Sequence, residues 1–284
     1  MTARALVVAA LLVLAAVLLL WLAQRRLLYF PAREGRAEAE RRGRRLGLEP
    51  WLDGGELIGW RAARPAGDPP ARARMVVLHG NAGSALDRDY VAEAFRHPSP
   101  QLPVDVYLVE YPGYGARPGA PSQRVLVAAA LQAVAAARRD GPGPVLLLGE
   151  SLGSAVAALA AAEAPGAIDG LILVTPLASV PAVARRHYPP LPAWFFRDPY
   201  RADAALPRYR GPVAVLLAGA DEVVFADLGA ALFDAYPGPK ALWVDRPATH
   251  NGLDWRPALD RWREMLQFVL GGHDPAAASH RALR

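Results

Sequence analysis

Residues Val145–Ser154 read VLLLGESLGS, and this stretch decides the fold. Its aliphatic run is typical of a fully buried parallel strand, and the Ala-rich sequence that follows is typical of a helix. Between them, Gly149, Ser151 and Gly153 form a Gly-x-Ser-x-Gly pattern. Glycines beside the serine let neighbouring backbone approach closely, so a sharp strand-to-helix turn can hold the hydroxyl above the sheet edge. The pattern alone also suits an ordinary turn, but its position between strand and helix favours a nucleophilic serine.

Similar apolar runs alternate with helical patterns along the chain. Strands that alternate with helices favour a mostly parallel sheet covered by helices on both faces. A hairpin at residues 51–60, turned by Asp-Gly-Gly, precedes them. The sequence therefore predicts an α/β protein with one large domain at residues 51–270. The expected strands are 75–78, 104–109, 145–148, 170–174, 213–218 and 240–244, and further helices are expected at 87–96, 122–139, 225–236 and 257–270.

An apolar segment near the amino terminus covers residues 5–23. Its length suffices to span a hydrocarbon core of about 30 Å. A signal peptide has a shorter apolar region and small residues before its cleavage site, whereas Trp21 occupies the −3 position of a cut after Ala23. The sequence therefore predicts an uncleaved, single-pass anchor at residues 1–26. More arginines follow the segment than precede it, which indicates a cytoplasmic domain, although signal anchors with short basic tails also insert the other way.

Residues 27–50 are expected to form a basic linker with a short helix, and residues 271–284 a loose tail. The formal net charge is +5, and many of the arginines lie in this linker. Because they adjoin an apolar segment and lack interleaved aromatic residues, they suit anionic lipid better than nucleic acid, so no nucleic-acid partner is expected. A solvated helix face explains them equally well. The absence of cysteine excludes disulfides and thiolate chemistry.

Residues 176–209 interrupt the alternation of strands and helices. The segment is rich in proline and carries Tyr188, Trp194, Phe195 and Phe196. Placed between two core strands, it forms either an apolar lid suited to an acyl chain or lipid, or an ordinary connection that packs its aromatic residues on the core. The sequence leaves both interpretations open.

A serine nucleophile needs a base to take its proton, and the base needs an acid to fix its tautomer. His250 follows the last predicted core strand and Asp221 follows the strand before it. Both should therefore lie at the sheet edge that carries Ser151, because the carboxyl ends of parallel strands meet in one crevice. His79, in contrast, is expected to shape its loop. Alternative acids adjoin these positions: Glu222, Asp245 and Asp254.

Acyl transfer also needs N–H donors for the oxygen that becomes negatively charged. The backbone N–H of Leu152, at the helix start after the serine, is one expected donor. The other donor should come from the loop after the 75–78 strand, where the backbone N–H of Asn81 is the expected group. A tight turn without any ligand role is the alternative for Asn81.

The chain carries the motifs HGNAG at 79–83, YPGYG at 111–115, Pro121-Ser122, GESLG at 149–153, Asp221 and His250-Asn251. Together these motifs resemble the α/β-hydrolase superfamily over residues 51–270. Within it they are similar to membrane-anchored serine hydrolases that include protein depalmitoylases and monoacylglycerol or lysophospholipid lipases. The family usually has arginine at the position of Pro112, and glycine at those of Ser154 and Thr249.

The resemblance implies an α/β-hydrolase fold with a short lid insertion and an N-terminal transmembrane helix. It also implies hydrolysis of carboxylic esters or thioesters through an acyl-enzyme on Ser151, with a lipid or acylated protein as substrate. No dinucleotide, phosphate-loop or zinc-protease motif is present, so no cofactor or metal is expected. An acyltransferase with the same residues and a non-enzymatic, membrane-tethered binding protein are the alternatives. Nothing in the sequence indicates the oligomeric state.

Overall fold

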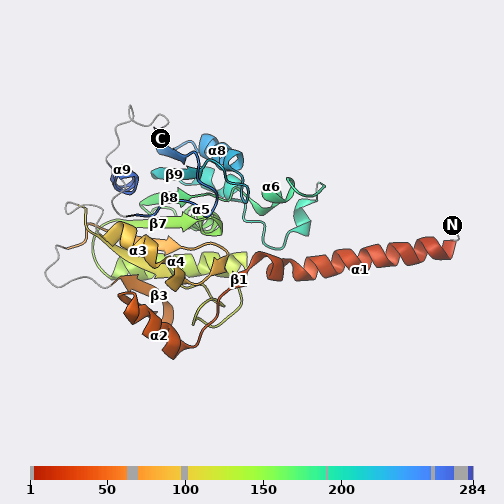
Figure 1. Cartoon of the computed structure of the whole chain (residues 1–284), viewed down its shortest axis with the longest axis horizontal. Coiled ribbons are helices and arrows are strands. Elements are labelled where there is room, and N and C mark those ends of the chain that lie inside the picture. Colours follow the sequence, from red (N-terminus) through yellow and green to blue (C-terminus); the bar gives the residue numbers. More distant parts are fainter. Residues whose placement is uncertain are drawn as a thin grey trace.

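The computed structural model describes residues 3–62, 70–96, 102–189, 191–256, 260–271 and 281–283. A twisted sheet crosses the domain, with helices on both of its faces, and one long helix projects away from it (Figure 1). The sheet has the order β11-β10-β9-β8-β7-β4-β6-β3-β2. Neighbouring strands are parallel except in the two pairs that β3 forms, with β2 and β6. The mostly parallel sheet and the opening hairpin agree with the sequence pattern.

The strands of this sheet are β2 (Leu48–Asp53), β3 (Glu56–Ala62), β4 (Ala73–Leu78), β6 (Val104–Val109), β7 (Val145–Glu150), β8 (Gly170–Val174), β9 (Val213–Ala218), β10 (Lys240–Asp245) and β11 (Arg281–Leu283). The helices are α1 (Ala3–Leu28), α2 (Arg36–Arg45), α3 (Asp89–Arg96), α4 (Gln123–Arg139), α5 (Leu152–Glu163), α6 (Val180–Ala184), α7 (Ala202–Ala205), α8 (Ala226–Ala235) and α9 (Asp260–Val269). A two-stranded sheet and short 3-10 helices complete the fold: β1 (Phe30–Pro31), β5 (Ala82–Gly83), η1 (Ala85–Arg88), η2 (Ala193–Phe195) and η3 (Leu206–Arg208).

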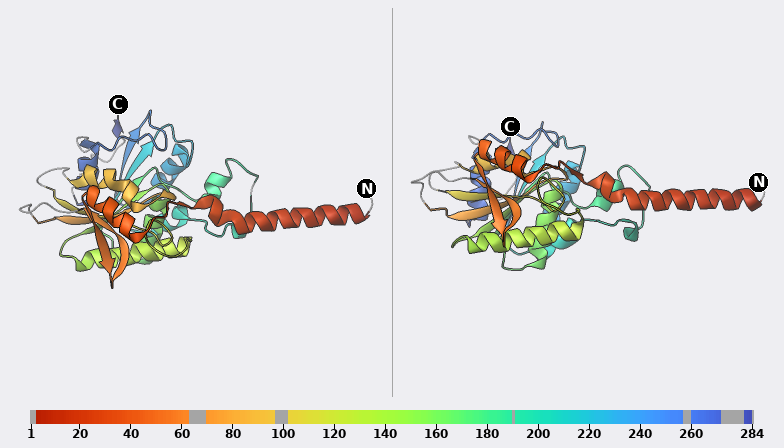
Figure 2. Two further views of the ribbon diagram at one scale, coloured as in Figure 1. Left: turned by 60° about the horizontal axis from the view of Figure 1, so that its bottom comes forward. Right: turned by 90° about the horizontal axis from the view of Figure 1, so that it is seen from below.

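Two apolar cores lie on opposite faces of the sheet. All six residues of β4 are buried, and its alternating side chains divide between the cores because successive residues of a strand point to opposite faces. Val76 and Leu78 join the core shared with α4, α5 and α8. Met75 and Val77 join the core shared with α2, α3 and α9. Helices therefore cover both faces of the sheet (Figure 2).

Local signals fix where α4 begins. The hydroxyl of Ser122 accepts a hydrogen bond from the N–H of Val125 at 3.3 Å, so it caps the first turn. The helix then runs to Arg139, as the sequence predicts. Its Ala-rich inner face packs on α5, the helix that follows the serine turn.

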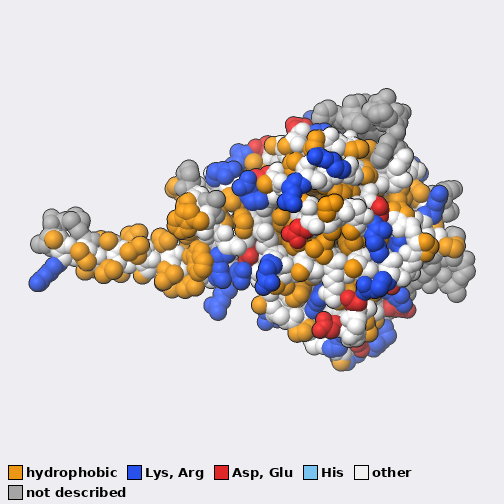
Figure 3. All heavy atoms as spheres, turned by 180° about the vertical axis from the view of Figure 1, so that it is seen from behind, with side chains coloured by type: hydrophobic (Ala, Val, Ile, Leu, Met, Phe, Trp, Pro, Cys, Tyr) orange, Lys and Arg blue, Asp and Glu red, His pale blue; other side chains and the backbone are white. Residues whose placement is uncertain are grey.

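Helix α1 has the length and composition to cross a membrane. None of its most apolar window is buried inside the protein, whereas a core helix would be mostly buried. Hydrophobic side chains cover the projecting part, and basic side chains gather where it meets the domain (Figure 3). The helix ends at Leu28, two residues beyond the boundary expected at residue 26.

The stretch expected to be a basic linker packs into the domain. Helix α2 buries Ala39, and a Cβ on Gly43 would lie 2.8 Å from the ring of Trp60. Strand β1 pairs with β5, and β2 begins at Leu48 instead of residue 51. At the other end, residues 281–283 of the expected tail pair with β10 as β11, whereas residues 272–280 and 284 lie outside the described residues.

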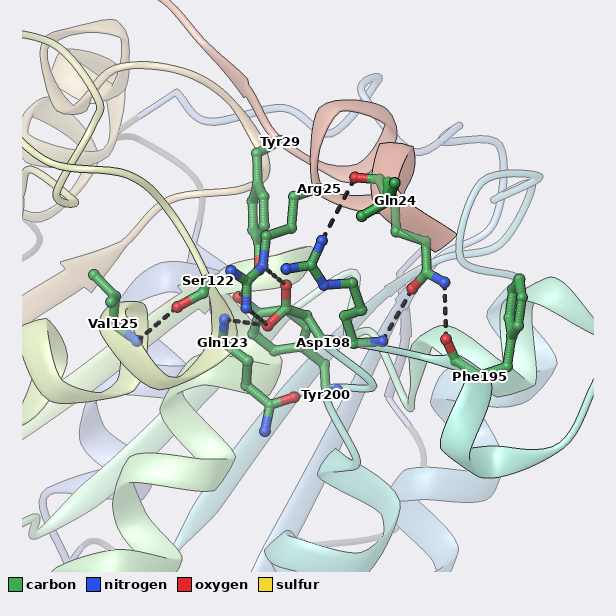
Figure 4. A network of polar contacts seen from close by, with 11 residues as sticks. Gln24, Arg25, Tyr29, Ser122, Gln123, Val125, Phe195, Asp198 and Tyr200 are labelled. Carbon is green, nitrogen blue, oxygen red and sulfur yellow. Dashed lines mark hydrogen bonds and ion pairs between the residues drawn. The ribbon is translucent and has the colours of Figure 1, made fainter. Parts of the chain in front are cut away.

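Polar contacts tie the last turns of α1 to the domain (Figure 4). Arg25 forms an ion pair with Asp198 at 2.7 Å, and the same carboxylate accepts a hydrogen bond from the N–H of Gln123 at 2.9 Å. The Tyr29 and Tyr200 hydroxyls lie 2.9 Å apart in the core. One end of α1 is therefore joined directly to residues 176–209, which we call the lid segment, and through Asp198 to the start of α4.

Candidate active site

The turn between β7 and α5 holds Ser151 in an unusual backbone conformation, with φ 53° and ψ −118°. Its N–H donates to the carbonyl of Val174 at 2.9 Å. Both flanking glycines are sterically required. A Cβ on Gly149 would lie 2.5 Å from the carbonyl oxygen of Gly153, and a Cβ on Gly153 would lie 1.9 Å from that of Leu78. The close backbone approach expected from the Gly-x-Ser-x-Gly pattern is therefore present.

Three residues from separate loops meet at this turn. His250 Nε2 lies 3.0 Å from Ser151 Oγ, and His250 Nδ1 lies 2.8 Å from Asp221 Oδ2. A carboxylate only accepts hydrogen bonds, so the proton on Nδ1 points at Asp221 and Nε2 is left to accept from the serine hydroxyl. The arrangement has the geometry of a nucleophile, a base and an acid that orients the base.

Asp221 is held as a carboxylate. Burial opposes its ionisation, but the hydrogen bond from His250 and those from the N–H groups of Val224 and Val223 outweigh burial and lower the pKa of Asp221 below its ordinary value. The alternative acids are engaged elsewhere or point to solvent. Asp245 pairs with Arg261, Asp254 with Arg256, and Glu222 is exposed.

The two expected oxyanion donors lie beside Ser151. Leu152 is the first residue of α5, where backbone N–H groups have no intrahelical acceptor, and Leu152 and Asn81 both line the hollow at Ser151. The side-chain amide of Asn81 donates to the carbonyl of Leu28 at 2.8 Å, and the backbone carbonyl of Asn81 accepts from the hydroxyl of Tyr114 at 2.8 Å. These contacts fix the loop that carries the Asn81 N–H.

His79 supports this loop from beneath. Its ring packs between Tyr111 and Tyr114, and Nδ1 lies 2.7 Å from the carbonyl of Gly80. Complete burial lowers the pKa of His79 to about 3, so the ring is neutral at physiological pH. His79 therefore shapes the loop, as expected. Of the remaining histidines, His187 lines the hollow, and His97, His273 and His280 lie outside the described residues.

A hollow of about 410 Å³ opens above Ser151, and we call it the Ser151 hollow. Arg88 and Glu150 form a charged side of it, joined by an ion pair at 2.9 Å. Sequence reasoning missed several residues of its apolar side, among them Leu28 at the end of α1. A helix end that lies more than one hundred residues before the serine gives no local signal of this contact. The other lining residues missed include Val180, Val183, Ala184 and Val224.

The lid segment divides into a part that packs on the core and a part that lies beside α1. Tyr200, Leu206 and Tyr209 are buried in the core, as an ordinary connection would place them. The earlier part lies beside α1 instead (Figures 1 and 2). There, Tyr188 borders the Ser151 hollow, and Trp194 is 78% exposed. Phe195 is buried and Phe196 half-buried, and both line a second hollow against α1.

Ser154, where the family pattern usually has glycine, links the serine turn to the lid segment. Its hydroxyl donates to the carbonyl of Ser151 and accepts from the N–H of Leu177 at 2.9 Å. Among the described residues, no group of three or more His, Cys, Asp or Glu side chains is arranged to hold a metal ion.

The sheet order and the strand–serine–helix turn are those of an α/β hydrolase, and the chain belongs to the α/β-hydrolase family. The family model described as alpha/beta hydrolase fold matches residues 73–208. The chain is 35% identical over 277 residues to uncharacterized protein Rv2307c of Mycobacterium tuberculosis, which covers 93% of this chain and 95% of that protein. The fold expected from the motifs is thereby confirmed.

Solved structures of esterases and lipases share this fold. Est1E from Butyrivibrio proteoclasticus superposes with a TM-score of 0.60 at 19% identity, over 78% of this chain and 98% of Est1E. A monoacylglycerol lipase of Paleococcus ferrophilus superposes with a TM-score of 0.53 at 18% identity, over 72% of this chain and 96% of the lipase. At such identities the likeness is one of fold.

Proposed function

We propose that this protein is a membrane-anchored serine hydrolase that cleaves carboxylic ester or thioester bonds of acyl-chain or lipid-like substrates. The observation that carries the proposal is the continuous line of hydrogen-bond contacts from Ser151 through His250 to Asp221. A binding protein gains nothing from a strained serine aligned with a base and a buried acid. The Ser151 hollow adds room for a substrate beside the hydroxyl.

In the proposed reaction, Ser151 Oγ attacks the acyl carbonyl carbon while His250 Nε2 takes the hydroxyl proton. The N–H groups of Asn81 and Leu152 donate to the oxyanion that forms, and one such donor typically contributes about 3–4 kcal/mol. The bond to the leaving oxygen or sulfur then breaks, and the proton on His250 passes to the leaving group. Water attacks the acyl-enzyme by the same route and releases the carboxylic acid.

The long apolar helix α1 supports the proposed membrane location. Helix α1 is exposed, apolar and long enough to span a bilayer, and basic residues flank the end that meets the domain. Charge asymmetry across the span favours a cytoplasmic domain. The membrane is then where a lipid or an acylated protein would meet the enzyme.

Labelling with a fluorophosphonate tests the nucleophile directly, because the reagent reacts with activated serines. We expect the wild-type protein to be labelled, and the Ser151→Ala protein to be unlabelled while keeping its fold. Ser179→Ala is the matched control, since Ser179 lies in the lid segment and only caps α6. Equal labelling of the wild-type and Ser151→Ala proteins would refute the assignment.

A further inference from the structure

A second hollow, of about 290 Å³, adjoins the Ser151 hollow, and we call it the anchor–lid groove. Leu28, Val180, Ala184 and Tyr188 line both spaces. The far walls of the groove come from α1 on one side and from the lid segment on the other. They include Leu20, Leu27, Leu191, Phe195 and Phe196. A chain that begins at Ser151 can therefore continue between the anchor helix and the lid segment.

The groove offers an occupant almost no free polar group. Gln24 and Asp198 are its charged or amide-bearing residues, and both are engaged (Figure 4). Gln24 donates to the carbonyl of Phe195 at 2.8 Å and accepts from the N–H of Arg197 at 3.0 Å. The carboxylate of Asp198 accepts hydrogen bonds from Arg25 and from the N–H of Gln123. The remaining surface is aliphatic and aromatic, and it therefore suits a hydrocarbon chain.

One face of α1 forms the long wall of the groove. Leu20, Gln24, Leu27 and Leu28 follow the spacing i, i+4, i+7 and i+8, which places them on a single helix face. They span about 12 Å along the axis at about 1.5 Å per residue. Leu20 is 47% exposed and Leu27 60% exposed, so the protein leaves this wall open. The same helix continues as the exposed apolar span, which in the proposed membrane-anchored enzyme would lead from the groove into the bilayer.

The part of the Ser151 hollow that does not border the groove includes two charged side chains. Arg88 and Glu150 lie there as an ion pair, and Tyr90 donates to Glu150 at 3.0 Å. This charged side suits a polar alcohol or thiol leaving group, such as a glycerol or a protein side chain. The apolar groove lies toward α1 and is left for the acyl group.

We propose that the anchor–lid groove binds the acyl chain of the substrate, which slides in from the bilayer along α1 and brings its carbonyl to Ser151. The last turns of the anchor are then part of the substrate site in addition to holding the enzyme at the membrane. This inference rests on the proposed function, because it needs an acyl substrate at Ser151. It adds the chain class, a long aliphatic acyl group, and its path.

A photoreactive fluorophosphonate tests the path in the full-length protein. The probe carries a twelve-carbon alkyl chain with a terminal diazirine, and Ser151 displaces its fluoride. After irradiation in phospholipid nanodiscs, we expect crosslinks in the tryptic peptides 5–25 and 187–197, which contain Leu20 and Phe195–Phe196. Crosslinks confined to other peptides would overturn the groove assignment. Absence of any label at Ser151 would instead contradict the proposed function.

Chain-length kinetics give a second, independent readout. Leu27→Trp should fill the groove and lower the ratio of kcat/KM for a twelve-carbon to a four-carbon p-nitrophenyl ester about tenfold, equivalent to about two buried methylene groups. Leu19→Trp is the matched control, because Leu19 is a similarly exposed leucine of α1 at 66% and lies off the groove face. An equal ratio in the Leu27→Trp and Leu19→Trp proteins would exclude the groove as the acyl site.

Discussion

Ser151 occupies a backbone conformation that residues with a Cβ seldom adopt, and the structure around it holds that conformation in place. The N–H of Ser151 donates a hydrogen bond to the carbonyl of Val174 in β8. Gly149 and Gly153 let neighbouring backbone approach the turn more closely than a Cβ would allow. Strain of this kind typically costs about 1–3 kcal/mol and persists at sites where it orients a functional group. Here it aims Oγ at His250.

Ser151 and His250 are expected to act as one unit, so that replacing either residue should remove most of the hydrolytic activity. We expect Ser151→Ala and His250→Ala each to lower hydrolysis of a short p-nitrophenyl ester by about 10⁴-fold or more, because each removes the activated nucleophile. The double variant should be little slower than either single variant. Additive losses in steady-state kinetics would show that the two residues act separately.

The acid can be identified by comparing two aspartates near His250. Asp221→Asn keeps the side-chain shape but removes the charge that orients the imidazole, so kcat should fall by about 10⁴-fold. Asp254→Asn is the matched control, since Asp254 pairs with Arg256 at the surface. A larger loss of kcat in the Asp254→Asn protein would reassign the acid.

We expect Glu110 to make the stability of the protein depend on pH. It is fully buried, and its oxygens accept from the N–H of Ala85 at 3.0 Å and from the indole of Trp60 at 3.2 Å. Burial raises the pKa of Glu110 from 4.5 to about 7. The unfolded chain therefore releases this proton at lower pH than the folded protein does, so stability falls as the pH rises through this window.

The expected loss is of the order of 3 kcal/mol, fully developed above about pH 7 and absent below about pH 4. Glu110→Gln cannot ionise and should lose this dependence. The check is the free energy of unfolding of both proteins, measured by denaturant titration from about pH 4 to about pH 8. Parallel pH profiles for the Glu110→Gln and wild-type proteins would contradict the assignment.

At the scale of elements, the serine turn depends on how closely α5 approaches β4. Because a Cβ on Gly153 would overlap the carbonyl of Leu78, we expect Gly153→Ala to destabilise the fold by about 1–3 kcal/mol or more. Gly35→Ala is the control, since a Cβ there meets no atom within 4 Å. Thermal unfolding followed by circular dichroism measures both; a Tm for Gly153→Ala equal to that of Gly35→Ala would mean that α5 shifts freely.

The sequence predicts elements whose signals are local. Aliphatic runs predict the buried strands, and Ser122 predicts the start of α4. The glycines beside Ser151 predict the serine turn. Because parallel strand ends share one edge, the sequence also places Asp221 and His250 near Ser151. The α1 contacts have no such signal, since Gln24 and Phe195 are 171 residues apart. Neither periodicity nor turn chemistry encodes that pairing, so the anchor–lid groove emerges only from the three-dimensional structure.

At the scale of the whole molecule, α1 has two parts that lie in different surroundings. Its first part is exposed and apolar, whereas Gln24 and Arg25 in its last turns contact the lid segment. Removal of residues 1–26, the boundary expected from the sequence, would take Gln24 and Arg25 with the span. An earlier cut, before Leu20, would remove most of the proposed membrane span and keep the residues of α1 that line the anchor–lid groove.

Two truncations test this division. Removing residues 1–19 should move the protein from the membrane fraction to the soluble fraction, while the contacts of Gln24 and Arg25 remain. Removing residues 1–28 should also lower thermal stability, because Asp198 then loses its ion-pair partner and its buried charge is left less compensated. Centrifugation of membranes and thermal unfolding measure the two effects. Retention of the shorter truncation in membranes would show that another surface holds the protein there, and equal Tm values for both truncations would show that the end of α1 adds nothing to the domain.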